Sequence, residues 1–568
     1  MNTMRLLSII IMCGLIFTSE VKSEVLFVSS EQEFADAHNS ASTNDSIVWR
    51  TGIYSDVRMD IEKDDLTVMA EELGSVIFTD VSRVNIFGDN IVFQGFQYLN
   101  GHLGPQDIVN ITGSHILFTQ INIRGYSCNK YLRVRDESRF VDITYCNFEN
   151  RVNLIDQNIL SILVDATTPG YHKIQHCSFK NFEGNGNDEG IEPIRIGVST
   201  QSEFASRSVV EHCYFRQCNG DGEIISSKAS QNVYRFNTFE DNPVSELVLR
   251  HGSENIVYGN FFINGKGGVR VREGQDHYIY NNYFQDLDDR AMFLQNDDSD
   301  PLDNINIGFN TIVECSEIRL GGVGSDPPTN VTFSNNIFVN SDSNIFNDAT
   351  GTETWISNIS FGDIGIPLPA NGMTIIDPQL EENSAGFFGL AETSPAIDAA
   401  EPGFAPLPDY MDIENLDTEI LFDLMGQSRP QSIEERDLGS NEYPHDILIM
   451  PMATEENTGP DYNTSISVSV QNTIQNVKDL IRINPNPVSD QFNIEINVKS
   501  KGELRIDIIN AEGRIVDTTY RTIVFPGKMT IAKNANNLPA GLYVVSASHG
   551  NTQEKIESIQ TVKCIKLP

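Results

Sequence analysis

One lysine and three arginines recur at intervals that match a single repeat of this chain. Lys228 and Arg250 are 22 residues apart, and Arg270 and Arg272 follow 20 and 22 residues after Arg250. In a coil of about 22 residues such positions stack on neighbouring strands about 4.8 Å apart, close enough for two side chains to reach one sugar ring. A column of cations suits an anionic linear polymer. A solvated stripe of cations that pair with nearby acids is the simpler alternative.

Acidic side chains precede the lysine. Asp221 and Glu223, in the stretch GDGEIIS, are two residues apart, so both carboxylates leave the same face of a strand. Glu192, in EPIRIG one coil earlier, can supply a further oxygen. Because Ca²⁺ binds oxygen ligands of this kind, the three residues predict either a calcium site or salt bridges to the cations.

The middle of the chain repeats a triplet that usually ends in an aromatic residue. The triplets CNF, CSF, CYF, NTF, NFF, NYF, NTI and NIF end at positions 148, 179, 215, 239, 262, 284, 312 and 338, at intervals of 22 to 36 residues. Short β-branched segments lie between them, separated by Gly, Asn and Asp. We therefore expect a right-handed parallel β-helix with about three strands per coil, stacked Phe residues inside and an Asn ladder at a turn. A β-propeller is the runner-up, but its blades need about 40 to 50 residues.

The composition limits the possible partners. The 568 residues carry a formal net charge of −40, 39% of them are hydrophobic, and the mean hydropathy is −0.25. These values predict a folded chain with two domains or an elongated repeat. The charge argues against nucleic acid or an anionic membrane as a partner. A polyanionic ligand would require local positive charge or a bound metal ion.

The N-terminal residues 1–23 are typical of a secretory signal peptide, with Arg5, an apolar run from Leu6 to Phe17 and the small residue Ser23. A short membrane anchor is the alternative, although the run is short for a span. No other segment is apolar enough to cross a bilayer, so we expect an exported protein. Seven cysteines remain after signal removal, without metal-site spacing, and we expect those in the repeat triplets to pack in the core.

The pattern changes toward the C-terminus. We expect the β-helix over residues 24–445, a linker rich in Asn, Thr and Ser over 446–479, and a small antiparallel β-sandwich over 480–568. The motif NPNP at 484–487, a turn at Gly513 and LPAGLY at 538–543 resemble the C-terminal sorting domain of type IX secretion in Bacteroidetes. This resemblance implies export across the outer membrane by the type IX machinery, followed by removal of the domain. An ordinary carbohydrate-binding sandwich is the alternative.

The residues around the cation column resemble polysaccharide lyase family 6, which includes alginate lyases and chondroitinase B. The resemblance covers most of residues 24–445 and rests on EPIRIG at 192–197, EIISSKASQN at 223–232, LRHG at 249–252 and NFF at 260–262. It implies Lys228 as the general base and Arg250 as the proposed acid. It also implies Asp221 and Glu223, with Glu192 in addition, as ligands of Ca²⁺ against the substrate carboxylate.

Two positions depart from the family pattern. The interval between the lysine and the arginine is one residue longer than usual, which we attribute to an insertion around Asn242 and Pro243. Asp221 stands where the family has a glutamate, so the oxygen ligand is kept with a shorter reach.

The residue types fit a β-elimination on a 4-linked uronate. The base must remove the C5 proton, and a lysine does so when neighbouring cations lower its pKa. A metal ion on the adjacent carboxylate stabilises the negative charge that develops. Because the pKa of an arginine exceeds 12, Arg250 either donates the proton or acts electrostatically while water donates it.

Further residues are expected to hold the substrate. Arg195, Arg270 and Arg272 are predicted to bind its carboxylates or sulfates. His251 contacts substrate or orients Arg250, unless strand alternation turns it away and makes it structural. We therefore expect a secreted, calcium-assisted lyase acting on alginate. The alternatives are a chondroitin or dermatan sulfate lyase, a β-helix glycoside hydrolase with clustered catalytic Asp residues, and a non-catalytic surface adhesin or polysaccharide-binding protein.

Overall fold

The computed structural model describes the chain in two compact units, Met1–Thr464 and Ser465–Pro568. The described residues of the first are 23–153, 155, 157–184, 190–295, 301–321, 327–348, 350–383, 386–408, 410, 420–444 and 449–462. Those of the second are 481–484, 491–498, 502–510, 515–524, 527–535, 538, 541–550 and 556–566. Residues 1–22 of the predicted signal peptide lie outside the described residues. The same is true of residues 485–487, 511–514, 539 and 540 in the sorting-domain motifs.

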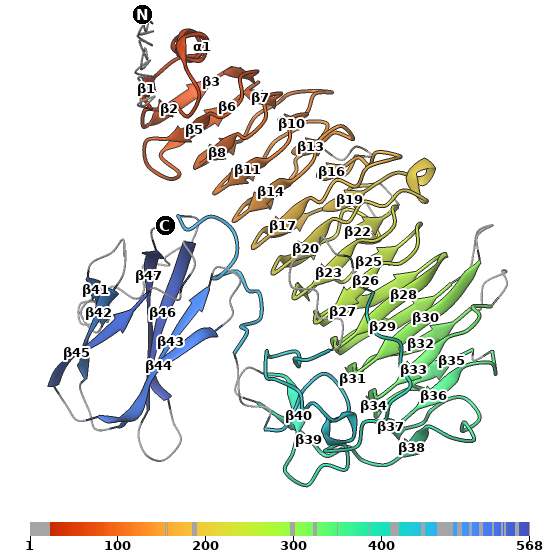
Figure 1. The fold of residues 1–568 in the computed structure, drawn as a ribbon. Helices are drawn as coiled ribbons and strands as arrows, with labels where there is room; N and C mark the ends of the chain where they lie inside the picture. Colours follow the sequence, from red (N-terminus) through yellow and green to blue (C-terminus); the bar gives the residue numbers. More distant parts are fainter. Residues whose placement is uncertain are drawn as a thin grey trace, which may run out of the picture. The chain divides into compact units, whose positions relative to one another are not determined.

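The first unit is a parallel β-helix whose coils follow one another along the chain (Figure 1), as the repeats predicted. Each complete coil contributes a strand to each of three sheets. The first sheet consists of β1 (Val25–Val28), β2 (Ser46–Trp49), β5 (Thr67–Ala70), β8 (Val92–Gln94), β11 (Ile116–Thr119), β14 (Val141–Thr144), β17 (Lys173–Gln175), β20 (Val209–Glu211), β23 (Val233–Arg235), β26 (Ile256–Tyr258), β28 (Gly274–Tyr280), β30 (Leu302–Gly308), β33 (Thr332–Ser334) and β36 (Thr354–Ile356).

The second and third sheets share two long strands, β27 (Phe261–Val271) and β29 (Tyr283–Leu294). The second sheet also contains β3 (Gly52–Ser55), β6 (Val76–Thr79), β9 (Phe96–Leu99), β12 (Asn122–Arg124), β15 (Asn147–Glu149), β18 (Ser178–Phe182), β21 (Tyr214–Cys218), β24 (Thr238–Glu240), β31 (Thr311–Val313), β34 (Ile337–Asn340), β37 (Asn358–Gly362) and β38 (Met373–Ile375). The third contains β4 (Arg58–Ile61), β7 (Arg83–Ile86), β10 (Val109–Ile111), β13 (Leu132–Val134), β16 (Leu160–Ile162), β19 (Ile194–Ile196), β22 (Glu223–Ser227), β25 (Glu246–Leu249), β32 (Ile318–Leu320) and β35 (Phe346–Asn347). Outside the sheets lie α1 (Glu31–Ser40), the short hairpin β39 (Leu380–Glu382) and β40 (Phe388–Leu390), and the 3-10 turns Ser199–Gln201 and Ile433–Glu435.

Stacked side chains hold the coils in register. Successive phenylalanines from the repeat triplets, such as Phe215, Phe239 and Phe262, stack inside with ring centroids 4.7 to 4.8 Å apart. At one corner the amide of Asn260 donates to the side-chain oxygen of Asn282 at 2.9 Å, within a longer asparagine ladder. Both features confirm the sequence prediction, and they fix which residues of adjacent coils face each other.

The cysteines of the described part of the first unit are structural. Cys128, Cys146, Cys177, Cys213, Cys218 and Cys315 are free and buried. Burial raises the pKa of the Cys218 and Cys315 thiols well above the usual value, so these groups stay protonated. The prediction that the triplet cysteines pack in the core is confirmed.

The described residues of 380–462, which we call the return segment, run back along the outside of the β-helix. Leu407, Tyr410, Ile420 and Leu438 of this segment share an apolar cluster with outward residues of the first sheet, including Val233. Phe387, Leu424 and Met425 do the same with Phe261, Tyr283 and Val313 on the second sheet. Over these coils the return segment therefore covers the outer faces of the first and second sheets. Among the described residues, neither apolar cluster includes an outward residue of the third sheet.

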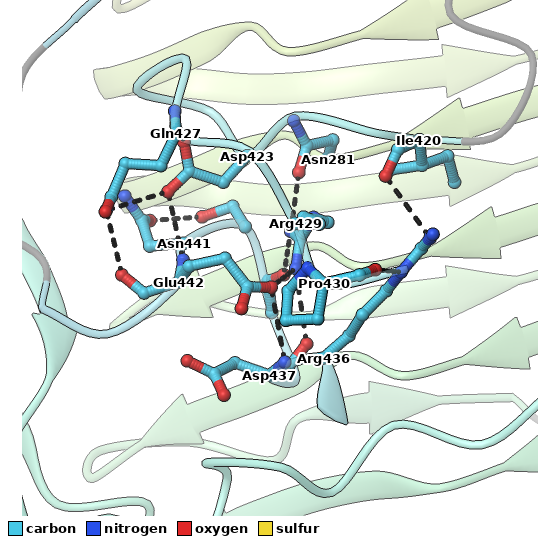
Figure 2. Close-up of polar contacts among 12 residues, drawn as sticks. Asn281, Ile420, Asp423, Gln427, Arg429, Pro430, Arg436, Asp437, Asn441 and Glu442 are labelled. Carbon is cyan, nitrogen blue, oxygen red and sulfur yellow. Dashed lines mark hydrogen bonds and ion pairs between the residues drawn. The ribbon is translucent and has the colours of Figure 1, made fainter. Parts of the chain in front are cut away.

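Arg429 fastens the return segment to the coils (Figure 2). Its side chain is fully buried, and its guanidinium donates to the Glu442 carboxylate at 2.5 Å and to the Asn281 side chain at 2.9 Å. The same group lies over the Phe309 ring, 4.8 Å from its centroid. Asn281 and Phe309 belong to the β-helix, so one buried cation joins the segment to two coils.

The last described residues of the return segment also pack on the β-helix. The Tyr462 hydroxyl donates to the carbonyls of Phe96 and Gln120, and its ring fills the space beside Gly74. Residues 449–462, placed in the linker by the sequence pattern, thus contact early coils. Their contacts involve residues more than 300 positions away, which no local pattern reports.

The second unit has two antiparallel sheets, in agreement with the predicted β-sandwich. One sheet orders β41 (Ile481–Asn484), β42 (Gln491–Val498) and β45 (Gly527–Asn534). The other orders β44 (Ile515–Val524), β43 (Gly502–Asn510), β46 (Gly541–Gly550) and β47 (Ile556–Lys566). Alternating apolar residues of both sheets, such as Ile494, Ile508 and Val545, share one core.

Candidate active site

The third sheet brings the predicted lysine and arginines into one column. Ser227 of β22 pairs with Leu249 of β25, and Leu249 pairs with Val271 of β27. Lys228, Arg250 and Arg272 each follow one of these residues directly, and the backbone amides of Arg250 and Arg272 donate to the coil before at 2.8 and 2.9 Å. The three side chains are therefore neighbours along the helix axis, at a spacing of about 4.8 Å per coil.

Two more predicted residues occupy the next outward column. Arg195 pairs with Ser226, Ser226 with Val248, and Val248 with Arg270. The guanidinium of Arg270 donates twice to the Gln295 side-chain oxygen, at 3.0 and 2.5 Å. Arg195 and Arg270 thus lie on either side of the position where Lys228 and Arg250 project.

The register between β22 and β25 has one irregularity, at Ile224, between the pairs Glu223–Glu246 and Ile225–Leu247. It lies before Lys228 and therefore outside the Lys228–Arg250 interval, to which the sequence interpretation assigned an extra residue near Asn242 and Pro243. Asn242 holds a regular corner position, where its amide oxygen accepts from Cys218 and its amide donates to Phe215. The bulge precedes Ser226, so the pairing that aligns Lys228 with Arg250 is unaffected.

Two buried carboxylates lie beside this column. Glu223 accepts a hydrogen bond from the Arg250 guanidinium at 2.5 Å, and its other oxygen is buried without a hydrogen-bond partner among the described residues. One Glu192 oxygen is buried and unpartnered in the same way. Burial raises the pKa of Glu192 to about 7, opposed by Arg195 and reinforced by nearby Glu223.

The predicted calcium ligands fit a metal ion in part. The unpartnered oxygens of Glu192 and Glu223 are the hard donors that Ca²⁺ accepts, and a buried oxygen without a partner is costly unless something binds it. Asp221 instead accepts from the backbone amides of Gly190 at 2.6 Å and Glu223 at 2.9 Å. Across the described residues no three acidic, His or Cys side chains come together as a metal-binding group. The three predicted ligands therefore do not form a complete set here.

The surroundings of Lys228 shift its proton affinity. Burial is the largest cause and lowers the pKa of Lys228 below its usual 10.5. Glu192 and Glu223 oppose this change, while Arg250 and Arg195 add to it. A lysine in such a setting is more often deprotonated at a given pH than an exposed one, as a general base requires.

His251 forms a pair with Glu273. Its Nδ1 contacts the Glu273 carboxylate, and both side chains are largely buried, 13% and 4% exposed. His251 follows Arg250 and Glu273 follows Arg272, so the pair joins the two coils that carry these arginines. This geometry supports a role in holding the arginine column at least as well as the predicted contact with substrate.

The sequence interpretation did not include a second buried ion pair, which lies between β29 and β25. Arg290 donates to both oxygens of Glu246, two coils earlier, at 3.1 and 2.6 Å. The pair passes over Gly267, where an added Cβ would lie 2.5 Å from the Glu246 carboxylate. The double glycine before Arg270 was the available signal, because it leaves space for a side chain that crosses the strand.

Comparison with known families gives this arrangement a context. The chondroitinase B family matches residues 28–293, which include Glu192, Glu223 and the column of Lys228, Arg250 and Arg272. The segment 28–293 belongs to the chondroitinase B family. A second family, the secretion system C-terminal sorting domain, matches residues 482–560. The sorting domain indicates a protein that is secreted or attached to the outer surface.

Solved structures of similar fold include polysaccharide lyases of family 6. A mutant of the alginate lyase AlyGC is 19% identical, with a TM-score of 0.61, covering 82% of this chain and 61% of that chain. A mannuronic acid-specific family 6 lyase from human gut microbiota is 21% identical, with a TM-score of 0.54, covering 60% of this chain and 86% of that one. This chain thus spans about three fifths of AlyGC and most of the gut enzyme. No curated protein matches the chain.

The family 6 neighbours establish the fold. No helix of the described residues is long and apolar enough to cross a membrane.

Proposed function

We propose that the protein is a polysaccharide lyase that cleaves alginate by β-elimination on the outer face of the third sheet. The observation that carries the proposal is the alignment of Lys228 with Arg250 on adjacent coils, next to the buried carboxylates of Glu192 and Glu223. The match of this same segment to a lyase family supports it. Several of the similar solved structures are alginate lyases, which favours a uronate polymer as the substrate.

Each side chain has a distinct task in this proposal. Lys228 takes the C5 proton of a uronate bound on this face. The electron pair forms a double bond between C4 and C5, and the C4–O bond breaks. The leaving oxygen receives a proton from Arg250 or from a water molecule that Arg250 orients. Arg250 also stabilises the negative charge that develops.

A calcium ion held by the unpartnered oxygens of Glu192 and Glu223 would neutralise the substrate carboxylate and acidify the C5 proton. Glu223 has one oxygen available for this purpose while the other holds Arg250. The same residue thus links the two parts of the site.

A lyase that acts on chondroitin or dermatan sulfate is the second candidate. The family matched by residues 28–293 is named for a chondroitinase, and Arg270 and Arg272 offer guanidinium groups that also suit sulfate. The reaction and the base are the same in both cases, so only the substrate differs.

An absorbance assay tests the proposal. The purified protein is incubated with alginate, dermatan sulfate and polygalacturonate, with and without EDTA, and the ultraviolet absorbance of the unsaturated product is followed. Alginate is expected to give a rising signal that EDTA suppresses. New reducing ends without absorbance would indicate a hydrolase. Neither signal on any polymer would leave a binding protein or adhesin as the function.

A further inference from the structure

Cations also cluster on the third sheet on the coils before Lys228. Arg133 of β13 pairs with Ser161 of β16, and Ser161 pairs with Arg195 of β19. The two arginines are therefore two coils apart, about 10 Å between their backbones. Ser161, which is small and buried, separates them.

Lys130 precedes β13 and lies near both arginines. It is 4% exposed, and its ammonium donates to the side-chain oxygens of Gln157 at 2.6 Å and Asn158 at 2.5 Å. Both acceptors are neutral amides, which satisfy hydrogen bonds but do not cancel the charge. Burial, followed by repulsion from Arg195 and Arg133, lowers the pKa of Lys130 to about 7. The three cations are thus close enough to oppose one another.

Few acids compensate for this charge among the described residues. Asp107 forms a salt bridge with Arg133 at 2.8 Å, and Glu192 is the other carboxylate near Lys130. The Nε of Arg195 is buried without a hydrogen-bond partner. An unpartnered buried donor beside crowded cations costs free energy that a bound anion would recover. Among the described residues, Asp107 and Glu192 are thus the carboxylates that oppose the charge of three cations.

We propose that Lys130, Arg133 and Arg195 form an anion-binding subsite for a carboxylate of the polymer chain on the coils that precede Lys228. Arg133 and Arg195, both half-buried, contact the carboxylate, while the nearby Lys130 adds positive charge in its protonated form. This inference rests on the proposed function, because it assumes that the polyuronate lies along the third sheet. It adds residues of β13 and its preceding loop to the substrate path.

The subsite makes cleavage depend on substrate length. Arg133 lies three coils before Lys228, which corresponds to about 14 Å along the β-helix axis. A short oligomer that only fills the positions around Lys228 and Arg250 does not reach it. A longer oligomer does, and gains a charge-assisted hydrogen bond.

The kinetic test compares Arg133→Gln with Arg216→Gln on oligouronates of increasing length. Arg216 is a matched control because it loses the same charge from β21, in the second sheet, where it pairs with Asp241. For Arg133→Gln we expect kcat/KM to fall about tenfold, or about 1.4 kcal/mol, on long oligomers and to stay unchanged on the shortest one that is cleaved. Arg216→Gln is expected to match the wild type at every length. An Arg133→Gln enzyme with wild-type values at all lengths, or with the same loss at all lengths, would overturn the proposal.

Asp107→Asn separates anion binding from a structural role of the salt bridge. The change leaves Arg133 in place and removes the carboxylate that competes for it. Tighter binding of a long oligouronate is expected, whereas weaker binding would show that the pair serves the fold alone.

A binding measurement distinguishes failure of the subsite from failure of the lyase proposal. Titration calorimetry uses the full chain carrying Lys228→Ala, with polyuronate or dermatan sulfate as the probe, and repeats both titrations after adding Arg133→Gln. We expect about tenfold weaker binding of the polyuronate. If the wild type yields no unsaturated product but Arg133→Gln weakens binding, the subsite stands and the lyase does not. If product forms and neither binding nor kinetics change, the lyase stands and the subsite does not. A loss confined to dermatan sulfate would contradict the carboxylate and assign the site to sulfate.

Discussion

At the scale of single residues, Lys228 depends on neighbours of both charge signs. The carboxylates of Glu192 and Glu223 raise its pKa, and burial with Arg250 and Arg195 lowers it, the net direction being downward. A site with cations alone would repel the ammonium but could not hold Ca²⁺. A site with carboxylates alone would keep the lysine protonated. Under the proposed function, the mixture would let one sheet face hold a metal ion and still provide a base.

The lowered pKa of Lys228 predicts the pH dependence of the reaction. Because only the neutral amine accepts the C5 proton, kcat/KM should rise with pH and level off with a midpoint below 10.5, the usual lysine value. The measurement is the initial rate of absorbance increase on alginate between pH 6 and pH 10. Activity that falls as pH rises from 7 to 9 would contradict a lysine base.

The ion pair of Glu223 and Arg250 predicts a non-additive effect on stability. Arg250→Ala leaves the Glu223 carboxylate buried without its partner and should lower the free energy of unfolding by about 1 to 3 kcal/mol. The double variant Arg250→Ala with Glu223→Gln should regain part of that loss, because the uncompensated charge is gone. Urea denaturation measures the free energy of unfolding of the wild type, the two single variants and the double variant. Strictly additive losses would mean that the pair is not coupled.

At the scale of elements, the return segment decides which face remains for substrate. Its apolar residues cover the outer sides of the first and second sheets over several coils. Arg429 joins it to Asn281 and Phe309 through a buried hydrogen bond and a ring contact. The cation column on the third sheet therefore coincides with the face that this covering leaves out.

Arg429→Met tests how firmly the segment is held. The change removes a fully buried cation and leaves Glu442 without its ion-pair partner, which should cost about 3 to 5 kcal/mol of unfolding free energy. Thermal and urea denaturation report the loss. Activity per folded molecule should be retained, because Arg429 lies outside the third sheet. A variant as stable as the wild type would show that the segment contributes little.

The sequence predicted the elements that repeat and missed those that do not. Triplets with aromatic ends specify the coil period, and that period alone places Lys228 beside Arg250. Contacts of Arg429 with Asn281, or of Tyr462 with Phe96, join positions far apart in the chain and follow no period. The Ile224 bulge and the crossing of Glu246 over Gly267 depend on side-chain packing, so the pattern of residue types could not locate them.

At the scale of the whole molecule, the distribution of charge matters more than its total. The chain has 79 Asp and Glu residues but only 39 Lys and Arg residues. Cations nevertheless line the third sheet from Arg133 through Arg195 and Lys228 to Arg272. Local potential governs the approach of a charged polymer within a Debye length of about 8 Å at physiological salt. An acidic protein can therefore bind an anionic polysaccharide along one face.

Truncation tests where the first unit ends. A chain that stops after Thr464 removes the second unit, which has its own core, and should unfold at the same temperature as the first unit of the full protein. A chain that stops after Pro444 also loses the contacts of Tyr462 and Asp461 with the early coils, and should lose about 3 kcal/mol or more. Calorimetry measures both. Equal stability of the two truncated chains would place residues 449–462 in the linker after all.

The central claim is that Lys228 removes the proton in a β-elimination. The most direct measurement is the formation of unsaturated product from alginate oligomers, followed by ultraviolet absorbance, for the wild type, Lys228→Ala and the control Arg216→Gln. The account predicts wild-type rates for Arg216→Gln and a loss on the order of 10²- to 10⁴-fold for Lys228→Ala, with its fold and its binding of the oligomer retained. Full activity of Lys228→Ala would contradict it.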